Sequence, residues 1–540
     1  MEAGPHDTLQ CRGETQHAPD DASQPERSSD STVILRADPL IHGHSSASTY
    51  FENGFTEAWP EDAPVADKYA KPTQTQAQAH RDRILDTSLS INTLPLEILL
   101  RIFWLSVFQS LHNQYLTPIP NPFQRDDRRD LVVLTHVCAH WRAVLLNTQA
   151  FWSRFEFSTR ESPVDVGNWA RVYCERAPDV PLSFYINERE LSSLNGNLMI
   201  EYIRPRLDRL ERMALINLQG ARHARKFIHF WMKRGKPGTL RTLIIRLDTE
   251  YFWYHETIST QDPSLTRQRV ESFLGPIRVL YLSGVRFEWD SPAYQNLVVL
   301  RLGSFSQIYS PQIREILAIL TACPQLHTLQ LYEMLILPSD TCASEPVHLN
   351  ELENLGLTEL SPESISLLLA RIFSRSKNLA LRMGSLRIDE KLILTCVRPF
   401  LARNNVTRLF IQRSIDVESD DISRYLSALP NLHTLLVDLD HLSSDKILSC
   451  LTYMNESNNA HMPICPQLHT LYLINGTVST GAIRQMVETH PCVRKLRFSD
   501  CTINPSEEEL HRWLKTFVVD VRFDVKVDRA EVFDWYHLMD

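Results

Sequence analysis

One apolar spacing recurs along most of this chain: an apolar residue, a second three positions later and a third five positions later. The spacing starts at Leu210, Leu240, Ile277, Leu297, Leu326, Leu352, Val406, Leu432, Leu468 and Val493, with a degenerate copy at Leu379. From Leu297 onward the starts are 29, 26, 27, 27, 26, 36 and 25 residues apart. A period near 26 predicts a stack of repeats in which each unit buries its apolar face only against its neighbours.

Helical patterns fill the intervals between the short strands. Residues 311–322, 362–373 and 390–401 each carry apolar residues at mostly helical spacing, and 422–429 and 481–487 are shorter stretches of this kind. Each unit therefore contains a strand and a returning helix, which predicts an α/β fold class. The spacing resembles the leucine-rich repeat, and the sequence Cys-Pro-Gln-Leu-His-Thr-Leu at Cys323 and again at Cys465 is similar to its cysteine-containing subtype. This resemblance implies a solenoid over 165–540 with a C-terminal cap.

A different pattern occupies Leu94 to Leu146. Pro95 suits the first position of a helix, and Glu97 then lies in the first turn, where the helix dipole favours a carboxylate. Apolar residues follow on one helical face, and the pattern repeats between Leu131 and Leu145. Two helical faces in about 50 residues make a small core, so we expect this module to lean on the rest of the chain or on a partner.

The residue pairs Leu94-Pro95, Glu97-Ile98, Asp130-Leu131, Val137-Cys138 and Trp141-Arg142 resemble the F-box. The resemblance implies a short all-α module that docks on the Skp-type adaptor of an SCF-type cullin–RING ubiquitin ligase, and through it reaches the cullin. The implied adaptor-binding residues are Leu94, Pro95, Ile98, Ile102, Leu131, Val137, Cys138 and Trp141. We expect the module to span 90–157, with an inserted loop at 111–129 because that stretch is longer than the usual link between the helices.

Composition excludes several other classes. A net charge of -9 over 540 residues argues against a generic nucleic-acid binder. Uninterrupted apolar stretches stay too short to predict a transmembrane helix, and the N-terminus has no apolar signal core. Ten scattered cysteines predict reduced thiols in the cytosol or nucleus. Residues 1–85 are rich in polar residues and proline and are interpreted as a disordered tail.

Catalytic and metal-binding patterns are absent from the sequence, so we expect no cofactor, no metal and no enzymatic chemistry. His327, His433 and His469 recur at one repeat position, which is interpreted as copying of a repeat template rather than a metal ladder. Cations between Arg222 and Lys236 surround three aromatic residues. They could grip an acidic or phosphorylated peptide, but a solvated helix face is the simpler interpretation. The aromatic run 251–255 is either an interface anchor or local packing.

Strand geometry indicates where a target protein would bind. The leucines of each unit point inward, and the residues that alternate with them point to the opposite face of the sheet. The predicted substrate-binding residues on that face are Tyr281, Arg301, Gln330, Tyr332, Arg408, Phe410, Tyr472 and Arg497. Aromatic residues and arginine are frequent interface hot spots, although the same residues also occur as ordinary solvated strand residues.

The sequence therefore predicts the substrate-recognition subunit of an SCF-type ubiquitin ligase, which holds an adaptor at one end and a protein target on its repeats. A non-ligase repeat scaffold, whose F-box-like stretch only caps the solenoid, is the alternative. An enzyme built on an α/β frame is a further alternative. The chain has only 16 glycines and a regular repeat, and both features argue against it.

Overall fold

The computed structural model describes residues 91–116, 127–157, 163–187, 203–218, 221–247, 256–259, 264–339, 345–384, 393–412, 423, 425–439, 444–455 and 460–523. The chain divides into two units, Met1–Thr87 and Ser88–Asp540, and every described residue belongs to the second unit. The tail predicted at 1–85, the aromatic run at 251–255 and the last residues of the predicted C-terminal cap, 524–540, lie outside the described residues.

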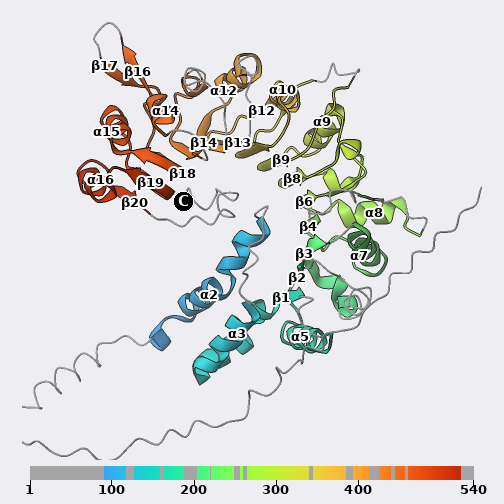
Figure 1. The fold of residues 1–540 in the computed structure, drawn as a ribbon. Helices are drawn as coiled ribbons and strands as arrows, with labels where there is room; N and C mark the ends of the chain where they lie inside the picture. The colour runs from blue at the N-terminus through green and yellow to red at the C-terminus, as the bar shows by residue number, and fades with distance from the viewer. Residues whose placement is uncertain are drawn as a thin grey trace, which may run out of the picture. The chain divides into compact units, whose positions relative to one another are not determined.

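The second unit is a mixed α/β structure built on one large parallel sheet (Figure 1). Within the described residues this sheet has 14 strands, which follow one another in chain order, so each unit of the sequence adds one strand beside the last. The strands are β1 (Arg154–Phe157), β2 (Leu182–Asn187), β3 (Leu210–Leu218), β4 (Thr242–Leu247), β6 (Val279–Ser283), β8 (Val299–Gly303), β9 (Thr328–Tyr332), β11 (Asn354–Thr358), β13 (Leu379–Gly384), β14 (Val406–Gln412), β15 (Thr434–Asp438), β18 (Thr470–Ser479), β19 (Lys495–Asn504) and β20 (Asp520–Arg522). This order is that of a solenoid-like α/β fold.

The longer connecting helices lie on one side of this sheet (Figure 1). They are α5 (Pro163–Arg176), α7 (Ala221–Arg234), α8 (Arg267–Leu274), α9 (Ile313–Thr321), α10 (Pro362–Leu369), α12 (Arg398–Arg403), α14 (Ser444–Ser449), α15 (Thr480–Thr489) and α16 (Glu507–Leu514). Short helical turns are η3 (Arg204–Arg209), η5 (Pro292–Tyr294), η6 (Gln307–Tyr309) and η7 (Ile393–Val397). No helix in the described part of the chain is long and apolar enough to cross a membrane.

Three small two-stranded sheets flank the large one. They pair β5 (Glu256–Ile258) with β7 (Val285–Phe287), β10 (Val347–His348) with β12 (Ile372–Phe373), and β16 (Thr452–Asn455) with β17 (Ala460–Pro463). The helix expected over 362–373 therefore ends at Leu369, and Ile372 lies in a strand instead. Its β-branched side chain is fully buried there, which suits a strand as well as it suits a helix.

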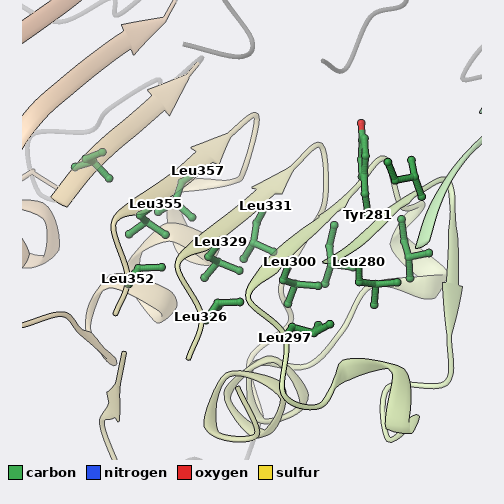
Figure 2. Close-up of a cluster of buried hydrophobic side chains, with 14 of the residues drawn as sticks. Leu280, Tyr281, Leu297, Leu300, Leu326, Leu329, Leu331, Leu352, Leu355 and Leu357 are labelled. Atoms are coloured by element: carbon green, nitrogen blue, oxygen red, sulfur yellow. The ribbon is translucent and has the colours of Figure 1, made fainter. Parts of the chain in front are cut away.

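The repeated leucines form ladders across the sheet. Leu280, Leu300, Leu329 and Leu355 are successive register partners in β6, β8, β9 and β11, and each is at most 1% exposed. Figure 2 shows them on the same side of their strands, with the Leu297, Leu326 and Leu352 side chains below. The degenerate copy that begins at Leu379 has a structural cause, because the register between β13 and β14 shifts between Leu379 and Ala380.

Arginines tie successive repeats together on the helix side. The Arg269 guanidinium donates hydrogen bonds to the Met232 and Lys233 carbonyls at the end of α7, over 2.6 and 3.1 Å. Arg403 donates in the same way to the carbonyl of Leu369 at the end of α10, and it also donates to the carbonyl of Ile372 in β12. Carbonyls at a helix C-terminus lack partners within their own helix and attract cations, so these side chains satisfy groups that the helix cannot.

An N-terminal helical module precedes the sheet. It consists of η1 (Ile91–Thr93), α2 (Leu96–Leu116), α3 (Asp127–Val137), α4 (Ala139–Asn147) and η2 (Gln149–Trp152). Helices occupy both ends of the loop expected at 111–129, because α2 continues to Leu116 and α3 begins at Asp127, and 117–126 lie outside the described residues. Proline, which breaks helices, first occurs after α2 at Pro118.

The module and the sheet share one hydrophobic core, which runs from Leu99 of α2 to Val518. The junction is η2, where the Trp152 indole donates a hydrogen bond to the Leu145 carbonyl over 2.9 Å and packs edge-on against Tyr173 of α5. Residues 154–157, which the sequence placed in the F-box-like span, form β1 and pair with β2. The boundary between module and repeats therefore lies before Arg154 rather than near 165.

Candidate functional site

Helix α2 of the module has two apolar faces. Leu99, Phe103 and Val107 lie at helical spacing and are at most 1% exposed, so they form the inward face. The second face carries Ile98 and Leu105, which are 49% and 39% exposed. Apolar side chains on a solvent-facing helical stripe lose contact with water only when another surface covers them.

We name this second face the α2 stripe and define it by Leu94, Ile98, Ile102 and Leu105. Leu94 and Ile102 are half-buried, and Pro95 beside them is exposed. Helix α3, which packs against α2, carries a second pair of exposed apolar residues at Val133 and Val137. They are 61% and 55% exposed and lie four positions apart on one helix face.

Cys138 and Trp141 hold the module together while staying half-buried. Cys138 caps the N-terminus of α4, because its sulfur accepts a hydrogen bond from the Trp141 backbone N–H over 3.4 Å. The Trp141 indole N–H donates to the Asn92 side-chain oxygen over 2.8 Å, and its ring packs edge-on against Phe103 at 4.7 Å. These contacts anchor η1, and with it the start of the α2 stripe, on α4.

Leu131 requires a correction. Its side chain is 1% exposed and belongs to the shared core, so it is not available to a partner in this structure. Leu131 follows the first turn of α3 at a position that packs inward, whereas Val133, which the sequence prediction omitted, faces solvent. The sequence pattern identified an apolar helical face here but did not distinguish the inward side from the outward side.

Most predicted substrate-binding residues lie in one row across the sheet. Register pairs Tyr281 with Arg301 and Arg301 with Gln330, and the same row passes through Gly356 and Arg382. It continues through Phe410, Leu436, Tyr472 and Arg497. Arg408 lies in the neighbouring row towards the start of the strands, and Tyr332 lies in the row towards their ends. Figure 2 shows Tyr281 pointing away from the leucines.

This row is less open than expected. Tyr281 is 3% exposed, Phe410 is 0% exposed and Tyr472 is 8% exposed, and Arg301 is also buried at 5%. Strands of a sheet lie about 4.8 Å apart, so bulky side chains in one row pack against one another. Gln330, Tyr332, Arg408 and Arg497 are half-buried and reach solvent in part.

A tyrosine pair links this row to the neighbouring row, because Tyr281 belongs to the first and Tyr332 to the second. The Tyr332 hydroxyl donates a hydrogen bond to the Tyr281 hydroxyl over 3.2 Å, and the two rings meet edge-on at 6.3 Å. Burial, and next the neighbouring Tyr281, hold the pKa of Tyr332 well above its usual range, so this phenol stays neutral. Tyr332 fits because residue 303 is glycine: a Cβ there would lie 2.5 Å from the Tyr332 ring.

Cations in the row interact with neighbouring strands and rings. The Arg382 guanidinium lies over the Phe410 ring at 5.0 Å. Arg497 holds Asp520 of β20 through two hydrogen bonds, one of 2.8 Å, which raise the pKa of Arg497 and lower that of Asp520. Arg497 therefore helps to fix the last described strand, in addition to lying on the predicted binding face.

The histidines of the repeats lie in two separate places. The His433 and His469 rings meet edge-on at 5.4 Å, and His327 directly precedes β9, which is well removed from β15 and β18 in the sheet order. Within the described residues, no group of three or more histidine, cysteine, aspartate or glutamate side chains is arranged to hold a metal ion.

Comparison with known proteins gives little further information. No protein-family model matches this chain, and no curated protein matches its sequence. Among solved structures, the crystal structure of a Rad7 and Elc1 complex in yeast contains a similar chain, with 11% sequence identity and a TM-score of 0.33. The match covers 81% of this chain and 100% of that one. A likeness of this size carries no information about function.

Proposed function

We propose that this chain is the substrate-recognition subunit of an SCF-type cullin–RING ubiquitin ligase, with an F-box module followed by a leucine-rich-repeat solenoid. The module binds the Skp-type adaptor, and the sheet face opposite the helices binds a target protein. The observation that carries this proposal is the α2 stripe, in which Ile98 and Leu105 remain exposed although the opposite face of the same helix is buried.

The remaining motif residues support this proposal. Leu94 and Pro95 begin the stripe, and Val137 adds a second exposed apolar position on α3. Cys138 and Trp141 act as positioning residues, since their hydrogen bonds fix η1 and α4 around the stripe. A partner helix laid along exposed residues at spacings of three and four buries them in the way that helix-in-groove recognition requires.

The mechanism that follows is one of proximity and not of bond chemistry. Holding a target on the sheet while the module holds the ligase raises the effective concentration of target lysines near the conjugating enzyme. The chain itself then needs neither a nucleophile nor a metal. The target-facing residues in this proposal are Gln330, Tyr332, Arg408 and Arg497, which reach solvent, and the buried Tyr281, Arg301, Phe410 and Tyr472, which support them.

The test is co-expression of the full chain with a Skp-type adaptor, followed by purification through a tag on the chain. Ile98→Glu places a charge in the stripe and should abolish co-purification, because burying an unpaired carboxylate is strongly unfavourable. Ile308→Glu is the matched control, since Ile308 is an isoleucine 83% exposed on η6, and this variant should co-purify like the wild type.

A non-ligase repeat scaffold is the second candidate. It is favoured by the single core that runs from the module into the sheet, because a module that only caps the repeats would also share their core. Failure of the wild-type chain to retain the adaptor, with the module folded, would support the scaffold and reject the ligase role.

A further inference from the structure

Two histidine side chains meet on neighbouring repeats, at the edge of the sheet where the strands begin. His433 directly precedes β15 and His469 directly precedes β18, and these two strands pair with each other. The His469 backbone N–H donates a hydrogen bond to the His433 carbonyl over 2.9 Å, so the two residues lie side by side. Their imidazole rings meet edge-on, with centroids 5.4 Å apart. We name these two residues the histidine pair.

The distance between the two rings is that of two ligands on one tetrahedral metal ion. An imidazole nitrogen binds Zn²⁺ at about 2.1 Å, which places the ring centre about 3.2 Å from the ion. Two such rings at a tetrahedral angle have centres about 5.3 Å apart. The rings of the histidine pair, at 5.4 Å, already have this separation. Rotation of the side chains is therefore enough to bring one nitrogen of each ring to a shared ion.

A hydrogen bond of His469 prepares one of its ring nitrogens for a metal. The Nδ1 atom lies 2.5 Å from the Gln467 carbonyl oxygen, which can only accept, so Nδ1 carries a proton. The Nε2 atom of the neutral ring is then unprotonated and can bind an ion. Histidines that bind metals commonly donate their other nitrogen to a carbonyl in this way. His433 is exposed, so its ring can turn towards the same ion.

Copying of a repeat template accounts for a histidine at this position but not for the contact between the two rings. His327 occupies the same repeat position before β9, and the residues at that position on the two neighbouring strands are Val298 and Glu353. His327 is therefore a single histidine in the same backbone setting, and it is half-buried like His469. It serves as the matched control for the histidine pair.

We propose that His433 and His469 bind one divalent transition-metal ion, such as Zn²⁺ or Cu²⁺, through one nitrogen each. Imidazole nitrogen suits these ions, whereas Mg²⁺ and Ca²⁺ prefer oxygen ligands. The remaining positions of the ion are open to water or to a side chain of a bound protein. The proposed ligase function does not require this site, because the histidine pair lies in neither the α2 stripe nor the predicted substrate-binding row.

A neighbouring cation distinguishes a metal ion from an anion as the ligand. Arg494 follows the histidine pair in the same row, because its backbone N–H donates a hydrogen bond to the His469 carbonyl over 2.8 Å, and its side chain is exposed. A cation beside a metal site lowers the affinity for the metal ion, whereas it raises the affinity for an anion such as phosphate. Arg494→Gln should therefore tighten the binding of a metal ion.

The test is modification of the full chain by diethyl pyrocarbonate during a titration with Zn²⁺, with the modified histidines mapped by mass spectrometry. Zn²⁺ should protect His433 and His469 together and leave His327 reactive, and Mg²⁺ should protect none of the three. His433→Ala should raise the Zn²⁺ concentration that protects His469 by about tenfold or more, because one of the two ligands is lost. His469→Ala should do the same for His433, and His327→Ala should change neither.

Three outcomes would overturn the proposal. The first is that Zn²⁺ protects neither histidine of the pair, or protects His327 equally. The second is that His469 stays protected at the same Zn²⁺ concentration in the His433→Ala variant, because the two rings would then not share an ion. The third is weaker protection in the Arg494→Gln variant, which would indicate an anion as the ligand.

Discussion

At the scale of single residues, hydrogen bonds separate the motif residues that hold the module from those that face outward. Trp141 illustrates this division. The motif tryptophan lies beside the exposed α2 stripe, so a direct contact with the adaptor was expected from the sequence. In the structure its indole N–H instead donates a hydrogen bond to Asn92, and its ring packs on Phe103. Sequence spacing identified Trp141 as important, but Asn92 lies outside the motif and was found only from the geometry.

The Asn92–Trp141 hydrogen bond predicts a coupled pair of variants. Trp141→Phe keeps an aromatic ring against Phe103 but removes the indole donor, and Asn92→Ala removes the acceptor. Each should lower the urea midpoint by an amount equivalent to about 1 kcal/mol and weaken adaptor binding. The double variant should be no less stable than the less stable of the two single variants, because both changes remove the same hydrogen bond. Additive losses of stability would show that the two side chains act independently.

Burial also sets the reactivity of the thiols. It raises the pKa of the Cys465 thiol to about 12, and it raises that of Cys323 as well, whereas Cys492 is exposed. Because the thiolate is the reactive form, a thiol reagent at pH 8 should modify Cys492 in the native protein and reach the other two only in urea. Peptide mapping by mass spectrometry measures this, and native-state labelling of Cys465 would contradict its placement in the core.

At the scale of elements, the apolar spacing predicted most strands of the large sheet. Each copy begins at or just before a strand, and even the irregular copy at Leu379 coincides with a shift of register. The three small sheets were not predicted, because strands of two to four residues carry too few positions for alternation to be recognised. The arginines that bind the helix ends of a neighbouring repeat were also missed, since their partners are carbonyls distant in sequence.

Packing between neighbouring strands predicts a strict requirement for glycine at position 303. A Cβ there would lie 2.5 Å from both ring and backbone atoms of Tyr332, whereas at Gly356 it would meet only the flexible Gln330 side chain at 3.1 Å. Gly303→Ala should therefore lower the thermal midpoint more than Gly356→Ala, and should displace the Tyr332 ring from Tyr281. Equal midpoints for the two variants would show that the tyrosine is not held against strand β8.

At the scale of the whole molecule, the described chain joins a helical module to a repeat sheet through one core. The sequence predicted that the module would lean on something, and η2 provides the contact through Phe151 and Trp152. Burial of the predicted substrate-binding row could not be foreseen, because alternation assigns a side chain to a face but does not reveal how tightly that face packs. Tyr281 and Phe410 illustrate this limit.

The central claim is that the exposed apolar residues of the module receive a Skp-type adaptor. Hydrogen–deuterium exchange of the full chain, with and without saturating adaptor, tests it most directly. Adaptor binding should protect the backbone amides in the first half of α2, around Ile98 and Leu105, and at the end of α3 near Val137, with no change in strands β6 to β14. Unchanged exchange in α2, or protection confined to the sheet, would contradict it.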